Sequence, residues 1–517
     1  MNKSKDEFIK HIELGYQSEG EYITIGTPLF ENDTITECSI KLALKTFNRH
    51  GLIAGATGTG KTKTLQVLAE CLSEKGIPVL LMDIKGDLSG LGAKGEDSSI
   101  LQERALKMGF THETRSFPIE LLSLSNEKGA RLRATVSEFG PVLFSKILGI
   151  NETQSSIVTI LFKYCDDNKL PLLDLKDFKK TLQYISEEGK VEIEKEYGKV
   201  SSASTSIILR KIVELEQQGG DTFFGEYSFE TDDLIRTSEK GEGIISVLRL
   251  TDIQDKPMLF STFMLCLLAE IYSTFPEQGD QDKPKLVIFI DEAHLIFEEA
   301  SKALLDQLET IIKLIRSKGV GIFFCTQTPT DIPSDILGQL GLKVQHALRA
   351  FTAKDRKSIK LTAENYPLSD FYNTEELITS LGIGEAMVTG LSEKGIPTPL
   401  SAVRLKAPSS RMDILTEDEI NTVVKQSKIA AKYNQVVDRE SAYEILNDRI
   451  ESKIKHSENA PEDKPRASEK EEKSAVEKAL SSPLAKEVGR TITRELTRGL
   501  LGVLGISTTK RRTKGWF

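Results

Sequence analysis

The sequence has few of the features that mark secreted or membrane proteins. Only 5 of its 517 residues are cysteines, and none of them forms a CxxC pair. A disulfide framework or a four-cysteine zinc site is therefore not expected. The N-terminus mixes acidic and basic residues and has no apolar signal core, and no run approaches about 20 consecutive apolar residues. These absences predict a cytoplasmic protein with no integral membrane segment.

The signatures of several enzyme classes are missing as well. The sequence has no G-x-S-x-G, no H-E-x-x-H and no N-K-x-D motif, so serine hydrolase, zincin and GTPase-type base recognition find no support. The net charge of −9 argues against a surface coated in positive charge. It does not exclude a local channel for nucleic acid, because binding responds to the local field.

Composition and hydrophobic pattern divide the chain into segments of different character. Short apolar runs alternate with amphipathic stretches in the core segments, whereas the later part of the chain is charged and poorer in apolar residues. We predict a short N-terminal β element over 1–50, an α/β core over 51–120 and 241–407, a helical insertion over 121–240, a helical extension over 408–456, a disordered linker over 457–483 and a basic amphipathic tail over 484–517.

The core segments predict an α/β fold with a mainly parallel sheet. Buried strands are expected at 51–54, 79–82, 243–250, 286–290 and 321–325, with helices between several of them. The apolar spacing also predicts helices over 121–150 and 417–455. The chain would thus combine a strand–helix core with two helical additions.

An eight-residue stretch after the first core strand carries the clearest chemistry. Gly55-Ala-Thr-Gly-Thr-Gly-Lys-Thr62 fits G-x-x-x-x-G-K-[ST], with a buried strand before it and an amphipathic helix after it. The glycines let backbone N–H groups point at phosphate oxygens, Lys61 reaches the β- and γ-phosphates, and the Thr62 hydroxyl is a ligand for Mg²⁺. The predicted nucleotide-binding residues are Gly55, Ala56, Thr57, Gly58, Thr59, Gly60, Lys61, Thr62 and Thr64.

The second half of such a site is expected at the end of another buried strand. The run 286–290 leads into Asp291 and Glu292. Asp291 would hold Mg²⁺ through water, and Glu292 would orient and deprotonate the attacking water. The alternative is that both carboxylates merely cap the following helix. Together with His294 they spell DEAH, but a lone histidine is more often a packing residue.

Further candidates have weaker support. Gln327 follows a strand and would sense the γ-phosphate, or it is a turn residue before Pro329. Positive charge on the transferring phosphoryl group is expected from arginine, and the candidates are Arg49, Arg316 and Arg349. Each of the three could equally be structural. The stretch 83–87 would touch Mg²⁺ or a neighbouring subunit, or be plain turn chemistry.

Taken together, these motifs resemble the HerA/FtsK superfamily of DNA-pumping ATPases. The resemblance rests on the stretches 49–62, 291–297 and 316–327. The more specific stretches 138–154, 218–226, 382–386 and 486–505 are similar to its bacterial YjgR-type branch. The phosphate loop begins at Gly55, which leaves too little preceding sequence for the full N-terminal β-barrel of typical HerA proteins.

The resemblance implies a RecA-like P-loop ATPase core that uses ATP and Mg²⁺. It implies a homo-hexameric ring with nucleotide sites between subunits, and helicase or translocase activity on double-stranded DNA. Arg49 and Arg316 match positions where the family places arginines that reach a nucleotide, some of them across the subunit boundary. With Lys61, Glu292 and Gln327, they complete the predicted catalytic set.

Two functions fit these observations. The first is an ATP-driven motor on DNA, with a basic channel formed by Lys343, Lys354, Arg356, Lys357 and Lys360, although these residues could also form an ordinary solvated surface. The second is an ATP-dependent switch or scaffold acting on a protein partner through the helical insertion or the tail, without DNA translocation. The tail could also bind an anionic membrane surface.

Overall fold

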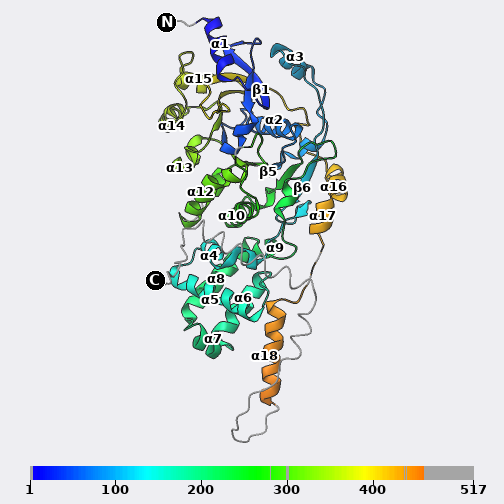
Figure 1. The fold of residues 1–517 in the computed structure, drawn as a ribbon, viewed down its shortest axis with the longest axis vertical. Coiled ribbons are helices and arrows are strands. Elements are labelled where there is room, and N and C mark those ends of the chain that lie inside the picture. The colour runs from blue at the N-terminus through cyan, green and yellow to red at the C-terminus, as the bar shows by residue number, and fades with distance from the viewer. Residues whose placement is uncertain (1–3, 280, 298–301, 436, 438, 459–517) are drawn as a thin grey trace, which may run out of the picture.

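The computed structural model describes residues 4–279, 281–297, 302–435, 437 and 439–458. Most of the predicted linker and the whole predicted basic tail lie outside the described residues. The described chain is elongated, with the sheet in one part and a group of helices in the other (Figure 1). The helix α18 (Ala442–Glu458) begins beside α6 (Leu175–Ser186) and extends beyond the other helices.

A single sheet of thirteen strands organises the structure, in the order β2-β1-β13-β12-β11-β4-β10-β9-β5-β8-β6-β7, with β3 also paired to β1. The strands from β11 to β7 run parallel, and the remaining pairs are antiparallel. The strands are β1 (Tyr22–Phe30), β2 (Asp33–Thr34), β3 (Ile40–Ala43), β4 (Gly51–Ala54), β5 (Val79–Asp83), β6 (Ile119–Ser123), β7 (Ala130–Arg131), β8 (Ile245–Arg249), β9 (Leu286–Ile290), β10 (Val320–Thr326), β11 (Leu342–His346), β12 (Glu385–Thr389) and β13 (Ser401–Leu405). The predicted α/β fold with a mainly parallel sheet is confirmed.

Both faces of the sheet are covered, which explains the continuous apolar runs of its central strands. Along β9, Leu286, Ile288 and Ile290 face one hydrophobic core, whereas Val287 and Phe289 face the other. The first core contains helices α10 (Pro257–Thr274) and α12 (Lys302–Ile315), and the second contains α1 (Lys5–Gly15) and α2 (Lys61–Glu74). The strand ends are thereby fixed between two packed layers.

Within the described residues, α10 is the one helix long and apolar enough to meet the criterion for a membrane span, and 67% of that stretch is buried in the protein. Phe263, Met264, Leu265 and Leu267 have no exposed surface. A core helix buried on several sides has the same composition as a membrane helix, so the apolar run is accounted for by packing.

The helices of the insertion form a separate layer beyond α10 (Figure 1). They are α4 (Val136–Ile147), α5 (Glu152–Asn168), α6 (Leu175–Ser186), α7 (Lys190–Glu196), α8 (Ser202–Gln217) and α9 (Gly220–Phe223). The prediction of helix over 121–150 is wrong in its first part, where β6 and β7 extend the sheet. A short apolar run fits a buried strand as well as a helix, and here the free edge of β8 decides between them.

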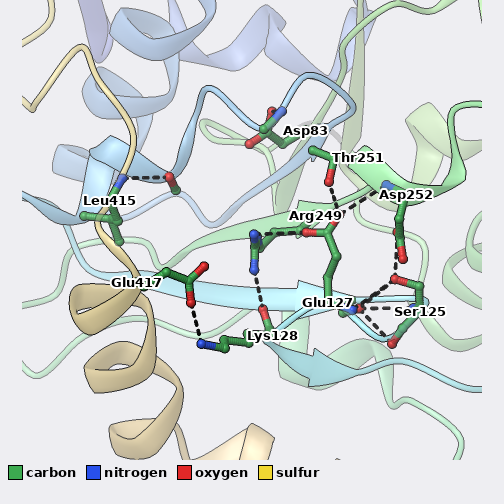
Figure 2. A network of polar contacts seen from close by, with 12 residues as sticks. Asp83, Ser125, Glu127, Lys128, Arg249, Thr251, Asp252, Leu415 and Glu417 are labelled. Atoms are coloured by element: carbon green, nitrogen blue, oxygen red, sulfur yellow. Dashed lines mark hydrogen bonds and ion pairs between the residues drawn. The ribbon is translucent and has the colours of Figure 1, made fainter.

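The predicted helix over 417–455 is divided into three: α16 (Glu417–Gln426), α17 (Lys428–Tyr433) and α18 (Ala442–Glu458). The first break is at Ser427, whose hydroxyl accepts the Ala430 N–H at 2.9 Å and so starts a new helix. The start of α16 is held on the sheet edge by the polar network of Figure 2. Its contacts join Glu127 with Arg249 and Thr251, Ser125 with Asp252, Lys128 with Glu417, and Ser89 with Leu415.

A buried histidine fixes the opposite, amino end of the central strands. The Ile322 N–H donates to Nδ1 of His50 at 3.1 Å, so the proton sits on Nε2, which donates to the Ile312 carbonyl at 2.9 Å. Burial, together with the charge of Arg316, lowers the pKa of His50 to about 4. Neutral His50 therefore ties the start of β4 to both β10 and the end of α12.

This arrangement predicts how stability depends on pH. Below pH of about 6.5, His50 in the unfolded chain takes up a proton that the native site refuses until about pH 4, so stability falls across that window. We expect the melting temperature of His50→Gln to fall by less than that of the wild type when the pH is lowered from 7.5 to 5, as measured by calorimetry. His346 has the same depressed pKa, so part of the slope should persist. The exposed His11→Gln variant is the control, and an unchanged slope in His50→Gln would contradict the assignment.

Candidate functional site

The phosphate loop lies where the carboxyl ends of three neighbouring strands meet. It connects β4 to α2, and its first residues are tied to the strands on either side. The Gly55 N–H donates to the carbonyls of Thr326 and Gln327, at 3.3 and 3.2 Å, and the Ala56 N–H donates to the Ala347 carbonyl at 2.9 Å. Strands β10 and β11 therefore set the position of the loop.

Two glycines give the loop its shape. Gly58 and Gly60 have φ angles of 80° and 110°, a region that residues with side chains rarely adopt. A Cβ at Gly58 would meet nothing within 4 Å, so this part of the loop borders open space. Gly60 directly precedes Lys61, the first residue of α2, so the helix N-terminus faces the same space. A turn of this kind followed by a helix start is suited to an anion.

Lys61 is buried beside this loop with few partners. Its side chain donates to the Ala56 carbonyl at 3.3 Å, and the residue is only 6% exposed. Burial lowers the pKa of the Lys61 ammonium, while the nearby charges of Asp291 and Glu292 act in the opposite direction. A buried ammonium held by one long hydrogen bond is incompletely compensated, and a phosphate oxygen would supply the missing partner.

Asp291 and Glu292 follow β9 and are both buried. Asp291 is 1% exposed, and burial raises the pKa of its carboxyl. Its Oδ2 atom has no hydrogen-bond partner among the described residues. Glu292 has a positive φ of 45°, and its carboxylate forms an ion pair with Lys85. The carboxylates are thus not engaged as helix caps, and Asp291 retains a buried oxygen that can bind a cation or its water.

Sequence reasoning did not identify Lys85 as a partner of the site. It lies just after β5, in the stretch 83–87, for which the sequence allows contact with Mg²⁺ or a subunit, or a simple turn. Burial lowers the pKa of Lys85, but the hydrogen bond to Glu292 and the charges of Asp291 and Glu292 outweigh this effect, so the net pKa is raised. Asp83 itself serves the turn: its carboxylate accepts the N–H groups of Gly86, Asp87 and Leu88.

The described residues fit Mg²⁺ bound to a triphosphate. In the part of the chain that the structure describes, no group of three or more His, Cys, Asp or Glu side chains could by itself hold a metal. Mg²⁺ typically takes one or two protein oxygens and completes its shell with phosphate oxygens and water. The half-buried Thr62 at the helix start and the unpartnered oxygen of Asp291 match that requirement.

The stretch 382–386 is hydrogen-bonded to the phosphate loop. The Gly384 N–H donates to the Thr59 carbonyl at 3.0 Å, and Arg104 donates to the Gly384 carbonyl at 2.8 Å. Behind the loop, the Thr64 hydroxyl is 2.9 Å from Nε2 of His346. Burial and the charge of Lys61 lower the pKa of His346 to about 4, so this imidazole is neutral at neutral pH. The Thr64 hydroxyl, which was predicted to bind nucleotide, therefore contacts a buried imidazole at the end of β11.

The remaining candidates divide between the two edges of the sheet. Gln327 is exposed beside the phosphate loop, and Arg349 lies on the same edge, donating to the Thr379 carbonyl at 3.3 Å. Arg49 and Arg316 instead precede β4 and β10, at the amino ends of these strands. Since β4 has four residues at about 3.3 Å each, Arg49 is about 13 Å of strand away from the loop of its own chain. Arg316 precedes the longer β10, which has seven residues.

Comparison with known proteins relates the sequence to a family of helicases. The family model described as Helicase HerA-like C-terminal matches residues 29–511. The DNA double-strand break repair helicase HerA of Saccharolobus solfataricus is 24% identical over 391 residues, covering 75% of this chain and 69% of that protein. The protein of the same name from Sulfolobus acidocaldarius is 22% identical over 383 residues, covering 73% and 70%.

A solved structure has a similar fold. The bacterial conjugative coupling protein TrwBdeltaN70 superimposes with a TM-score of 0.51 and 12% sequence identity, covering 78% of this chain and 94% of that one. The agreement extends the likeness from sequence motifs to the arrangement of strands and helices.

The support from Gly384 can be tested by substitution. Gly384 has a φ of 72°, and a Cβ there would lie 2.7 Å from the Arg104 guanidinium. Gly384→Ala should therefore displace the stretch that holds Thr59 and weaken binding of a nonhydrolysable nucleoside triphosphate several-fold by calorimetric titration. Gly149→Ala is the matched control, because its φ is 61° and a Cβ would meet nothing within 4 Å. Both variants carry strain of roughly 1–2 kcal/mol, and equal affinities in the two would contradict the supporting role.

Proposed function

Because the chain belongs to the HerA-like helicase C-terminal family, we propose that it is an ATP-hydrolysing motor that acts on double-stranded DNA as a cytoplasmic, ring-shaped homo-hexamer. The observation that carries the ATPase assignment is the convergence of the phosphate loop, Lys61, Asp291 and Glu292 at one edge of the sheet, each charged side chain buried and short of partners. Structural neighbours include TrwB with a nonhydrolysable ATP analogue and with ADP and Mg²⁺.

Each residue of the proposed site has a separate role in phosphoryl transfer. Mg²⁺ neutralises charge on the β- and γ-phosphates when bound, and Thr62 and Asp291 would hold it. The loop amides and Lys61 orient the phosphates. Glu292 takes a proton from the attacking water, whose oxygen bonds to the γ-phosphorus as the bond to the β–γ bridging oxygen breaks, leaving ADP and phosphate. Gln327 is exposed at the same edge and is the proposed sensor of the γ-phosphate.

The arginines argue for sites shared between subunits. Arg49 and Arg316 lie at the amino edge of the sheet, away from the phosphate loop of their own chain. Their placement supports action on a nucleotide held by a neighbouring subunit, which a closed ring provides for every copy. Such arginines stabilise charge that develops in the transition state and make turnover depend on assembly.

DNA contact is proposed for the helix α14 (Ala353–Glu364), which follows β11. Lys354, Arg356, Lys357 and Lys360 are exposed on it. Lys343 differs from them, because it donates to the Asn365 carbonyl at 3.1 Å and packs over the Tyr366 ring. Four exposed cations per subunit, repeated around a ring, would give a positive channel despite the negative net charge.

ATP turnover measured with and without duplex DNA tests the proposal, together with the mass of the assembly in ATP. We expect turnover that duplex DNA stimulates and that salt weakens. Lys61→Ala should lose nucleotide binding, and Glu292→Gln should keep ATP bound while turnover falls by about 100-fold or more.

The outcomes separate the two parts of the proposal. Turnover that is abolished by Glu292→Gln but indifferent to DNA would retain the ATPase and remove the motor on DNA, leaving an ATP-dependent switch acting on a protein partner. Turnover that survives Lys61→Ala would contradict the ATPase site itself.

A further inference from the structure

Glu292 is held by a cation from a part of the chain that the nucleotide motifs do not include. The Glu292 side chain is about 8% exposed, and its carboxylate forms an ion pair through Oε1 with the Lys85 ammonium. The second oxygen, Oε2, makes no hydrogen bond among the described residues, although Nδ1 of His294 lies 3.2 Å away. One oxygen is therefore committed to Lys85, and the other is a buried acceptor that makes no aligned hydrogen bond and faces the His294 imidazole.

The backbone that carries Lys85 is restrained on both sides. Before it, the Ile84 carbonyl accepts a hydrogen bond from the Gln254 amide at 2.6 Å. After it, the Asp83 carboxylate accepts the Gly86 N–H at 2.8 Å and two further N–H groups of the same turn. Figure 2 shows Asp83 near Thr251 and Asp252, at the end of β8. Lys85 thus reaches Glu292 from a fixed turn, and its side chain is 39% exposed.

Lys61 does not take this role in the structure, because its ammonium donates to the Ala56 carbonyl of the phosphate loop. A carboxylate that acts as a base needs a defined orientation, since its open oxygen must meet the water proton within hydrogen-bond distance. Because Oε2 of Glu292 makes no hydrogen bond among the described residues, that oxygen does not define an orientation for the carboxylate. The contact with Lys85 supplies one.

We propose that Lys85 is a positioning residue for hydrolysis, which holds Oε1 of Glu292 so that Oε2 is presented to the attacking water. This inference rests on the proposed catalytic role of Glu292. Lys85 acts through the glutamate and contributes little to the binding of nucleotide. Its position beside β5, between the strands that carry Asp291 and Arg249, places it in the same sheet edge as the chemistry.

Steady-state turnover and binding of a nonhydrolysable ATP analogue to the full-length protein test the proposal. Lys85→Met should lower kcat by about tenfold or more while KM and analogue affinity stay within about threefold. Lys85→Arg keeps the cation and should recover at least a third of kcat. Lys85→Gln serves as a second variant in case Lys85→Met does not fold. The exposed Lys94→Met is the matched control and should behave as wild type.

A double-variant cycle identifies the partner. If Lys85 acts through Glu292, adding Lys85→Met to Glu292→Gln should cost no further turnover. Three results would each overturn the proposal. They are turnover in Lys85→Met that equals or exceeds the wild type, additive losses in the cycle, and an analogue affinity that falls more than about tenfold. Undiminished turnover in Glu292→Gln would instead contradict the proposed catalytic role of the glutamate, so the two failures are distinguishable.

Discussion

Burial of charge at one edge of the sheet is the constraint on which the structure depends. Lys61, Asp291 and Glu292 are each at most 6% exposed, and they come from two different strand–helix connections. An ionised group in the interior costs several kcal/mol unless partners surround it. Here the compensation is incomplete: Lys61 has one carbonyl, Glu292 has Lys85, and Asp291 has a free oxygen. In the proposed function, a bound triphosphate and its cation complete the set of partners.

The parallel strands explain how residues so far apart in sequence meet. Carboxyl ends of parallel strands lie at one edge of a sheet, where β4, β9 and β5 deliver the phosphate loop, the two carboxylates and Lys85. The amino edge carries a different group, with His50 holding β4 to β10 and with Arg49 and Arg316 beside it. The amino edge carries the arginines and the carboxyl edge carries the phosphate loop and the carboxylates. The proposed ring brings the amino edge of one subunit to the carboxyl edge of the next.

The sequence predicted most of this edge because its signals are local. The run 286–290 is apolar throughout since both of its faces are covered, and the phosphate loop follows its strand directly. The sequence also contains a signal for the helix break at Ser427, because serine is a preferred N-cap residue. The prediction of one helix over 417–455 did not use it. The strand β6 could not be separated from a helix by periodicity, since its pairing with β8 is a tertiary contact. Lys85 was missed for the same reason: its partner is distant in sequence, and no motif links them.

The dependence of nucleotide binding on Mg²⁺ in wild type and Asp291→Asn tests the buried-charge account most directly. Titration with a nonhydrolysable ATP analogue, with Mg²⁺ and with a chelator, gives the gain in affinity that the cation provides. The account predicts a gain of about tenfold or more in wild type and its loss in Asp291→Asn, with the affinity in chelator equal or higher in the variant because a repelling charge is gone. An undiminished Mg²⁺ gain in Asp291→Asn would contradict the account.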